Sequence, residues 1–363
     1  MRIFVKMKPS NAYPLLQALA AAFLFGAGAP ISKLLLRDIE PAVMAGLLYL
    51  GSGAGLLLFT GIRKSVTGAG GAEARLAHAD IKWLAAAILT GGVAAPVTLL
   101  FSLRETPAAT ASLLLNFECA ATTLIAALLF RESISRRAWA AILCITLAGI
   151  LLSTDFSGSW GLSIGALGVL MACIFWGMDN NFTRNISAKD PLMIVTVKGL
   201  GAGSVSLGLG VVLGNPLPGF EAMAGAMLLG CLSYGLSIVL FIYAMRGLGA
   251  GRTSALFGTA PVAGIILSVI LFHETPGWLF MIALPVMIIG TISLATEEHH
   301  HEHRHREIVH EHRHTHDDGH HDGHLKENHP CTTHSHRHVH DGLQHTHHHL
   351  PDIHHRHGHP SEP

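Results

Sequence analysis

The chain is poor in charged residues, in paired cysteines and in recognisable catalytic motifs. Asp, Glu, Lys and Arg make up 13% of its 363 residues, about half of the share in soluble globular domains, so that class is excluded. None of the five cysteines forms a Cys-x-x-Cys pair and four lie in apolar runs, which excludes a disulfide-stapled secreted domain. No Walker-type phosphate loop or His-Glu-x-x-His motif occurs, and no Gly-x-Ser-x-Gly motif has a suitable context. We therefore expect no enzyme and no direct use of ATP.

Charge and histidine divide the chain into two unlike parts. Residues 1–296 hold 18 basic and 12 acidic side chains and only two histidines. Residues 297–363 hold 6 basic and 12 acidic side chains and 25 of the 27 histidines. The formal charges are therefore +6 and −6, and the apolar residues are concentrated in the first part.

Ten apolar segments of the first part are long enough to cross a bilayer, which takes roughly 20 residues as a helix. An eight- or nine-helix count would leave an apolar run unexplained. The pattern predicts an all-α integral membrane protein with ten transmembrane helices. Their approximate bounds are 13–36, 41–62, 81–103, 106–130, 137–154, 162–186, 191–213, 222–245, 249–272 and 277–295.

The charges of the loops predict the orientation. With the N-terminus in the cytoplasm, the inside loops hold 14 Lys and Arg residues, and the outside loops hold only Lys33, Arg37 and Arg104. Basic loops are retained in the cytoplasm, and an even number of helices brings the chain back to its starting side. We therefore expect both termini in the cytoplasm and the protein in the inner or plasma membrane of the cell.

The two halves of the apolar part resemble each other. LLFRES at 128–133 aligns with ILFHET at 270–275, an offset of 142 that also pairs Arg104 with Arg246. Each half has five predicted helices, an odd number, so the second half must cross the membrane in the opposite direction, an architecture typical of secondary transporters. The predicted organisation is an N-terminal segment 1–12, a first five-helix repeat 13–154, a linker 155–161, a second, inverted repeat 162–296 and a tail 297–363.

Three stretches carry a resemblance to a known family: LLLNFECAATTLIAALLFRES (113–133), WGMDNNFTR (176–184) and ALFGTAPVAGIILSVILFHET (255–275). They are similar to the EamA-type branch of the drug/metabolite transporter superfamily. The resemblance covers about 15–295 and implies a transporter with ten helices in two five-helix repeats, but no particular substrate. The first repeat departs from the family pattern, because Glu118-Cys119 stands where the second repeat has Ala260-Pro261.

One carboxyl group lies at the centre of a predicted span. Glu118 is twelve residues from each end of 106–130, about 18 Å along a helix, and therefore near the bilayer midplane. An ionisable group at this depth needs a partner or a wet cavity. Glu118 fits proton coupling or binding of a cationic substrate, and the alternative is a carboxyl that only locks two helices together.

The sixth span carries the densest polar cluster, near its cytoplasmic end. A functional interpretation is a polar lining of the substrate path. A structural interpretation is helix capping and a salt bridge from Asp179 to Arg184 or Lys189. The cluster consists of Asp179, Asn180 and Asn181, with Arg184 at the membrane boundary.

Lys198 lies about two turns into the seventh span. Its long side chain could reach the interface, but we expect a buried pair with a carboxylate, either Asp179 or Glu118. Tyr49 and Tyr234 face a cavity or belong to aromatic belts, and the sequence leaves both readings open.

Other candidates lie at the ends of spans or interrupt them. We expect Lys33 to anchor the first span at the outer interface, and Arg131-Glu132 and His273-Glu274 to act as loop caps or gates. Prolines inside a span remove backbone hydrogen bonds and are candidate bends. They are Pro96, Pro261 and Pro285.

The tail, residues 297–363, has few apolar residues and no periodicity, so we expect it to be disordered. Neutral imidazoles bind Ni, Co and Zn, but no spacing here defines a closed zinc site. A metal buffer or sensor, a pH-responsive tail and a tail without a role all remain open. The candidate tail ligands are His299, His300, His301, His320, His321, His347, His348 and His349.

Three functional hypotheses follow. The first is a secondary transporter, an exporter of a small polar metabolite that works by alternating access and is coupled to protons. The second keeps the fold but makes Ni, Co or Zn ions the cargo, with the tail as collector or sensor. The third is a non-transporting membrane sensor, which is disfavoured because no signalling domain is recognisable. We expect the bilayer and a small-molecule substrate as partners, no nucleic acid and no required cofactor, and leave a homodimer open.

Overall fold

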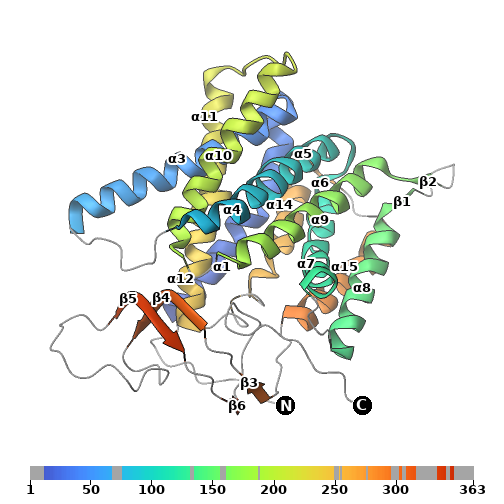
Figure 1. Ribbon diagram of the computed structural model, residues 1–363. Helices are drawn as coiled ribbons and strands as arrows, with labels where there is room; N and C mark the ends of the chain where they lie inside the picture. The colour runs from blue at the N-terminus through green and yellow to red at the C-terminus, as the bar shows by residue number, and fades with distance from the viewer. Residues whose placement is uncertain are drawn as a thin grey trace.

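The computed structural model describes residues 12–67, 76–130, 135–155, 161–186, 189–248, 253, 256–274 and 277–295, and four short segments of the tail. Helices occur within all ten ranges predicted as spans (Figure 1). In chain order they are α1 (Ala12–Gly26), α2 (Gly28–Leu35), α3 (Pro41–Thr67), η2 (His78–Asp80), α4 (Ile81–Ala87), η3 (Ile88–Ala94), α5 (Ala95–Glu105), α6 (Ala108–Leu114), α7 (Phe117–Phe130), α8 (Arg136–Ser153), α9 (Ile164–Arg184), α10 (Pro191–Val212), α11 (Phe220–Leu229), η4 (Gly230–Leu236), α12 (Ser237–Leu248), α14 (Ala260–Phe272) and α15 (Trp278–Ala295).

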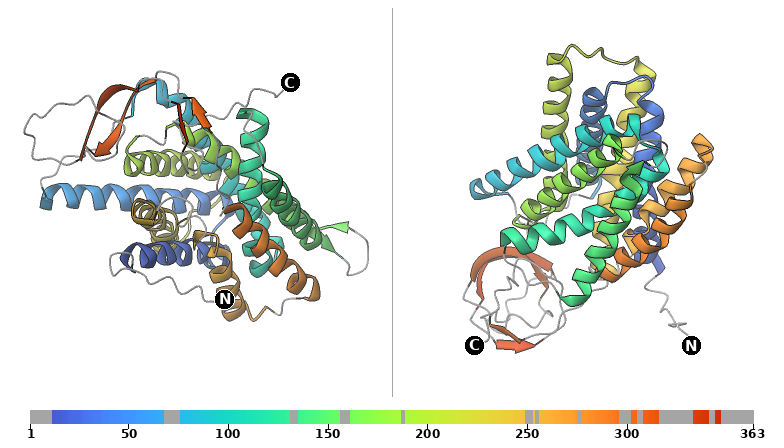
Figure 2. Two further views of the ribbon diagram at one scale, coloured as in Figure 1. Left: turned by 90° about the horizontal axis from the view of Figure 1, so that it is seen from below. Right: turned by 90° about the vertical axis from the view of Figure 1, so that its right-hand side faces the viewer.

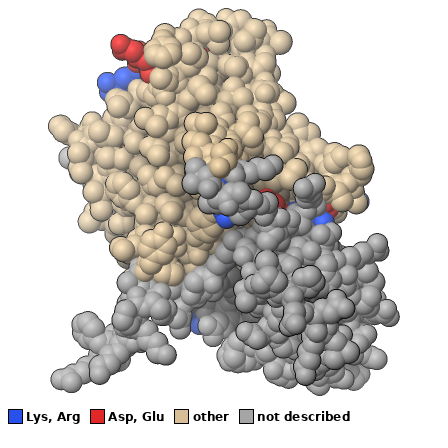
Figure 3. Space-filling model, turned by 90° about the vertical axis from the view of Figure 1, so that its left-hand side faces the viewer, with Lys and Arg blue, Asp and Glu red and all other residues tan. Residues whose placement is uncertain are grey.

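The helices have the length and surface of an integral membrane protein. Six helical stretches of the described chain are long and apolar enough to cross a bilayer, and α14 and α15 are apolar but shorter. Large apolar side chains point outward, with Leu128 78% and Val212 84% exposed. The described part of the face in Figure 3 carries few charged side chains. Apolar surface on this scale needs lipid around it. The six stretches are Tyr13–Leu35, Pro41–Arg63, His78–Glu105, Ala108–Leu129, Pro191–Val212 and Phe220–Ala244.

The span predicted over 106–130 is present as the membrane-length stretch Ala108–Leu129, but its helix is interrupted. The chain forms two helices, α6 and α7, separated by a turn at Leu115 and Asn116. The Asn116 side chain donates a hydrogen bond to the carbonyl of Leu113 at 3.3 Å, and such local side-chain bonds compete with the helical backbone pattern. Glu118 therefore lies in the first turn of α7 and not in the middle of a helix.

Two π-helical segments occupy equivalent positions in the two halves. η3 and η4 begin at Ile88 and Gly230 and span seven residues each, so they are offset by the same 142 residues as the sequence repeat. A π-helical turn disrupts the regular helical ladder and is frequent at functional sites. In the first half it directly precedes Pro96, which has no N–H to donate.

The other two prolines differ in their effect. Pro261 lies in the first turn of α14, where its missing N–H costs no helical hydrogen bond. Pro261 thus marks the start of α14, directly after a turn at Gly258 and Thr259. Pro285 lies inside α15, which continues on both sides of it.

The helices pack in pairs drawn from opposite halves of the chain. α3 packs along α10, α1 along α12, α5 along α9, and α8 along α15 (Figures 1 and 2). Glycines permit the close contact of α3 with α10: a Cβ atom on Gly53 would lie 2.6 Å from the nitrogen of Leu200, and one on Gly199 would lie 2.7 Å from the nitrogen of Gly53. Close glycine contacts of this kind are common between membrane helices.

Short strands occur where we predicted loop or disorder. β1 (Thr154–Asp155) pairs with β2 (Gly161–Leu162) at the predicted linker. In the tail, β3 (Glu302–Arg304) pairs with β6 (Gln344–Thr346), and β4 (Ile308–Thr315) with β5 (Thr333–His340). Disorder of the tail as a whole stays a prediction. β4 and β5 contain β-branched Ile, Val and Thr residues, which favour extended backbone. The candidate metal ligands of the tail lie outside the described residues.

Candidate functional site

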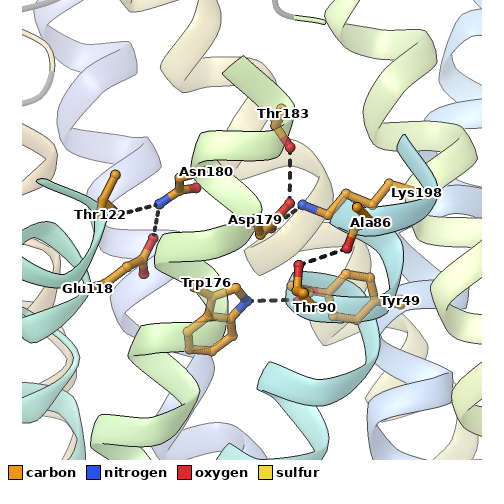
Figure 4. A network of polar contacts seen from close by, with 11 residues as sticks. Tyr49, Ala86, Thr90, Glu118, Thr122, Trp176, Asp179, Asn180, Thr183 and Lys198 are labelled. Atoms are coloured by element: carbon orange, nitrogen blue, oxygen red, sulfur yellow. Dashed lines mark hydrogen bonds and ion pairs between the residues drawn. The ribbon is translucent and has the colours of Figure 1, made fainter. Parts of the chain in front are cut away.

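The centre of the site is a buried ion pair between α9 and α10. The Nζ atom of Lys198 donates to Oδ2 of Asp179, and the side chains are 17% and 4% exposed. The hydroxyl of Thr183 donates to the other carboxylate oxygen, Oδ1, at 3.0 Å (Figure 4). Asp179 thus pairs with Lys198, the buried arrangement expected for that lysine. Lys189, one of the predicted alternatives, lies 3.8 Å from Asp80 instead.

A second polar group lies between α9 and α7. The amide nitrogen of Asn180 donates to Oε1 of Glu118 at 2.8 Å and to the hydroxyl of Thr122 at 3.1 Å. The amide of the buried Asn181 donates to the carbonyls of Thr122 and Gly177, at 3.0 and 2.8 Å. Asn181 therefore fastens α9 to the backbone of α7, whereas Asn180 holds the only carboxylate of the group. Figure 4 shows this group on the opposite side of α9 from the ion pair.

A backbone carbonyl of η3 joins two aromatic side chains. The amide of Ala95 donates to the carbonyl of Thr90, and the next residue, Pro96, has no amide hydrogen. The carbonyl of Gly91 is therefore left to side chains, and it accepts from the hydroxyl of Tyr49 at 2.7 Å and from the indole of Trp176 at 3.0 Å. Buried carbonyl groups require such partners.

Gly91 also brings η3 against the ion pair. A Cβ atom at this position would overlap the carboxylate of Asp179, so only glycine fits here. The π-helical segment, the ion pair and the two aromatic side chains form one continuous packed unit.

Aromatic rings from both halves of the chain contact one another in series, beginning at Tyr49. The rings of Tyr49 and Tyr234 lie 5.5 Å apart, those of Tyr234 and Phe25 6.2 Å, and those of Phe25 and Phe257 5.1 Å. Tyr234 comes from η4, the repeat partner of η3, and it is within electrostatic reach of Glu118. Tyr234 thus belongs to the interior, and not to an interfacial belt.

Solvent reaches this interior at Asn180. Successive helix residues turn by about 100°, which places the exposed apolar residues Ile164, Leu167 and Met171 on one face of α9. Asn180 lies on the opposite face, the one that is buried at Cys173 and Gly177, yet Asn180 itself is exposed. Its exposure is therefore to a space between helices and not to the lipid side of α9.

Arg184 and Lys33 complete the set of charged candidates. Arg184 is the last residue of α9, one turn beyond Asn180, and is partly buried. Lys33 does not lie free at an interface as an anchor would, because its Nζ atom donates to the carbonyl of Thr106 and lies 5.9 Å from the ring centre of Phe272.

The prediction missed Trp176, Gly91 and Thr122. The spacing of three residues between Trp176 and Asp179 places them on neighbouring parts of one helical face, and this was a usable signal. Nothing in the sequence near Gly91 or Thr122 indicates that they meet α9, because they come from other helices.

The fold and the site together define a class: a helical integral membrane protein with an ionic network in its apolar interior. Comparison with known proteins gives the family. The EamA-like transporter family matches residues 12–154 and, a second time, residues 163–296. The chain belongs to this family.

One similar protein supports the family assignment, and a second supports the fold. An uncharacterized transporter of Methanothermobacter thermautotrophicus is 30% identical over 291 residues, which are 76% of this chain and 84% of that protein. A solved crystal structure, of a protein without further description, superposes with a TM-score of 0.54 at 19% identity, over 79% of this chain and 99% of the other. At this identity the second comparison concerns the fold alone.

Proposed function

We propose that the protein is a secondary transporter that exports a small polar metabolite by alternating access. The observation that carries the proposal is the solvent-exposed Asn180, bound to Glu118, in the interior of a protein of a transporter family. Polar side chains at membrane depth are rare, face the bundle interior or a water-filled cavity, and mark substrate pathways. The path then runs between α7, α9 and α10, with Asp179, Asn181, Lys198, Arg184 and Tyr234 around it.

We infer that ten helices form two inverted five-helix repeats. The double family match, with bounds close to the predicted 13–154 and 162–296, supports this arrangement. The helix pairs support it too. In the two predicted repeats α1 corresponds to α9 and α5 corresponds to α12, so the observed pairs α1–α12 and α9–α5 are equivalent. The excess of basic residues in alternate loops supports cytoplasmic termini.

Glu118 is the group through which we propose proton coupling. Asp179 is already neutralised by Lys198, whereas the hydrogen bond that Glu118 accepts comes from a neutral amide, that of Asn180. A proton or a cationic group of the substrate would each remove its charge.

Proteoliposomes test the proposal. A panel of amines, amino acids and organic acids is added outside while a trapped dye reports internal pH. We expect at least one compound class to move protons with the wild type and not with Glu118→Gln. Glu40→Gln is the matched control, because Glu40 pairs with Arg104 on the surface at 3.0 Å. Substrate exchange that is insensitive to pH and unchanged in Glu118→Gln would refute the coupling role.

The metal-ion alternative is not proposed. Among the residues that the structure describes, no group of three His, Cys, Asp or Glu side chains is placed to hold a metal ion. Nothing in this part of the chain favours Ni, Co or Zn as cargo over an organic solute.

A further inference from the structure

A single carboxylate connects the two halves of the chain at the end of α14. Glu274 follows α14, in the second half, and accepts two backbone hydrogen bonds from α6, in the first half. The amide of Ala108 donates to Oε1 and the amide of Ala109 to Oε2, both at 2.8 Å. Hydrogen bonds to an ionised carboxylate are about twice as strong as neutral ones. The contact is therefore a strong one between segments 165 residues apart.

Lys33 strengthens the contact from a third helix. Its ammonium group donates to the carbonyl of Thr106, two residues before α6, and is attracted electrostatically by Glu274 and Glu105. Lys33 lies in α2, which packs against both α6 and α14. Positive and negative side chains from the two halves thus meet around the start of α6.

The backbone before Glu274 is turned to make this contact. His273 ends α14 in the left-handed region, with φ 52° and ψ 33°, and it is the one non-glycine residue with positive φ in the described chain. Non-glycine residues rarely adopt this conformation, and where they do the surroundings must hold them in it. The two hydrogen bonds of the neighbouring Glu274 provide that hold.

The contact of Glu274 with α6 lies far from Asn180, the exposed residue of the polar site. A Cβ atom on Gly165, at the start of α9, would lie 3.0 Å from the Cβ of Glu105, so α9 begins at the level of this contact. Asn180 is fifteen residues further along α9, about 22 Å at 1.5 Å per residue. The chain is therefore bound together at one end of α9 and open to solvent toward the other.

We propose that Glu274, Lys33 and residues 106–109 form a latch that closes one end of the transport path in this conformation. The latch must open for the alternate conformation. This inference rests on the proposed transport function, but it concerns the gating residues and not the substrate.

Two-sided labelling tests the latch without a known substrate. The reporter is Asn180→Cys in a background whose native cysteines are replaced, and the reagent is a membrane-impermeant maleimide applied to either face of sealed vesicles. We expect the reporter to react from the face opposite Glu274 only. Glu274→Gln removes the charge and should raise the labelling rate from the Glu274 face by about tenfold or more, since bonds to charged groups are the strong ones.

Glu40→Gln is the matched control, because the ion pair of Glu40 with Arg104 lies within the first half of the chain. Its labelling should stay one-sided. The latch would be overturned if labelling stayed one-sided in Glu274→Gln. It would also be overturned if Glu274→Gln and Glu40→Gln changed the labelling rate equally. Because labelling needs no turnover, a failure of the proposed transport activity is seen separately.

A second variant keeps the inference testable if Glu274→Gln does not fold. Ala108→Cys and Glu274→Cys, joined by a short bismaleimide, should leave the Asn180→Cys reporter accessible from the opposite face and abolish labelling from the latch face altogether. In substrate exchange, the cross-linked protein should lose activity at least tenfold relative to either single cysteine. Full exchange by the cross-linked protein would show that this end need not open.

Discussion

The ion pair between Lys198 and Asp179 should be among the most costly contacts to break by one substitution. Lys198→Met keeps most of the side-chain volume but removes the cation beside the carboxylate of Asp179, which is 4% exposed and also accepts a hydrogen bond from Thr183. Removing one partner of a buried pair costs about 3–5 kcal/mol, because the other charge stays buried without compensation. The ratio of folded to unfolded protein should therefore fall by at least about a hundredfold.

The double variant separates the charge from the packing. Lys198→Met combined with Asp179→Asn buries no ion, so it should recover roughly half or more of the loss. The assay is unfolding of purified protein in mixed detergent and SDS micelles, followed by tryptophan fluorescence. Arg104→Gln provides the control, because Arg104 and Glu40 are 36% and 38% exposed, and such surface pairs contribute about 0–1 kcal/mol.

Two results would refute this reasoning. A loss of stability in Lys198→Met no larger than that in Arg104→Gln would mean that water reaches the carboxylate of Asp179. A double variant as unstable as the two single losses added together would mean that the contact contributes packing and not charge compensation.

Two further predictions concern the carbonyl of Gly91. Gly91→Ala should destabilise the protein by about 1–3 kcal/mol in the same unfolding assay, because the new methyl group overlaps Asp179. The control is Gly61→Ala, whose methyl group would meet nothing within 4 Å and which should be neutral or stabilising by up to about 1 kcal/mol. An equal change of stability in both variants would count against the close contact of Gly91 with Asp179. Tyr49→Phe and Trp176→Phe each remove one of the two donors to this carbonyl. The double variant should lose more stability than the sum of the two single losses, since a buried carbonyl without a donor costs about 1–3 kcal/mol. A double-mutant cycle with no coupling energy would contradict the shared role of the two donors.

Much of the architecture was predictable from local patterns. Long apolar segments predict helices in a membrane because lipid offers no hydrogen-bond partner and the backbone must satisfy itself within each segment. The offset of 142 residues, found by aligning short stretches, recurs in the two π-helical segments at Ile88 and Gly230. The pairing of Lys198 with a buried carboxylate could also be expected, because few charges are available inside and each needs a partner.

Other features depend on contacts between helices that are distant in the chain. The break before α7 needs the local turn of Asn116, which competes only weakly with a strongly helical pattern. The shared carbonyl of Gly91 joins residues 42 and 85 positions away, Tyr49 and Trp176. Such contacts follow from the rotation of each helix about its axis, and hydropathy alone does not specify that rotation.

The amino-acid pattern was sufficient to predict apolar helices, their lipid surroundings and the similarity of the two halves, because burial in lipid acts on each segment separately. It could not establish which polar groups meet. Asn180 and Asn181 are neighbours in the chain, yet one faces solvent with Glu118 and the other fastens α9 to α7. Glu274 reaches Ala108 across 166 positions. These outcomes depend on the close packing of whole helices, in which displacements of an ångström decide whether a hydrogen bond forms.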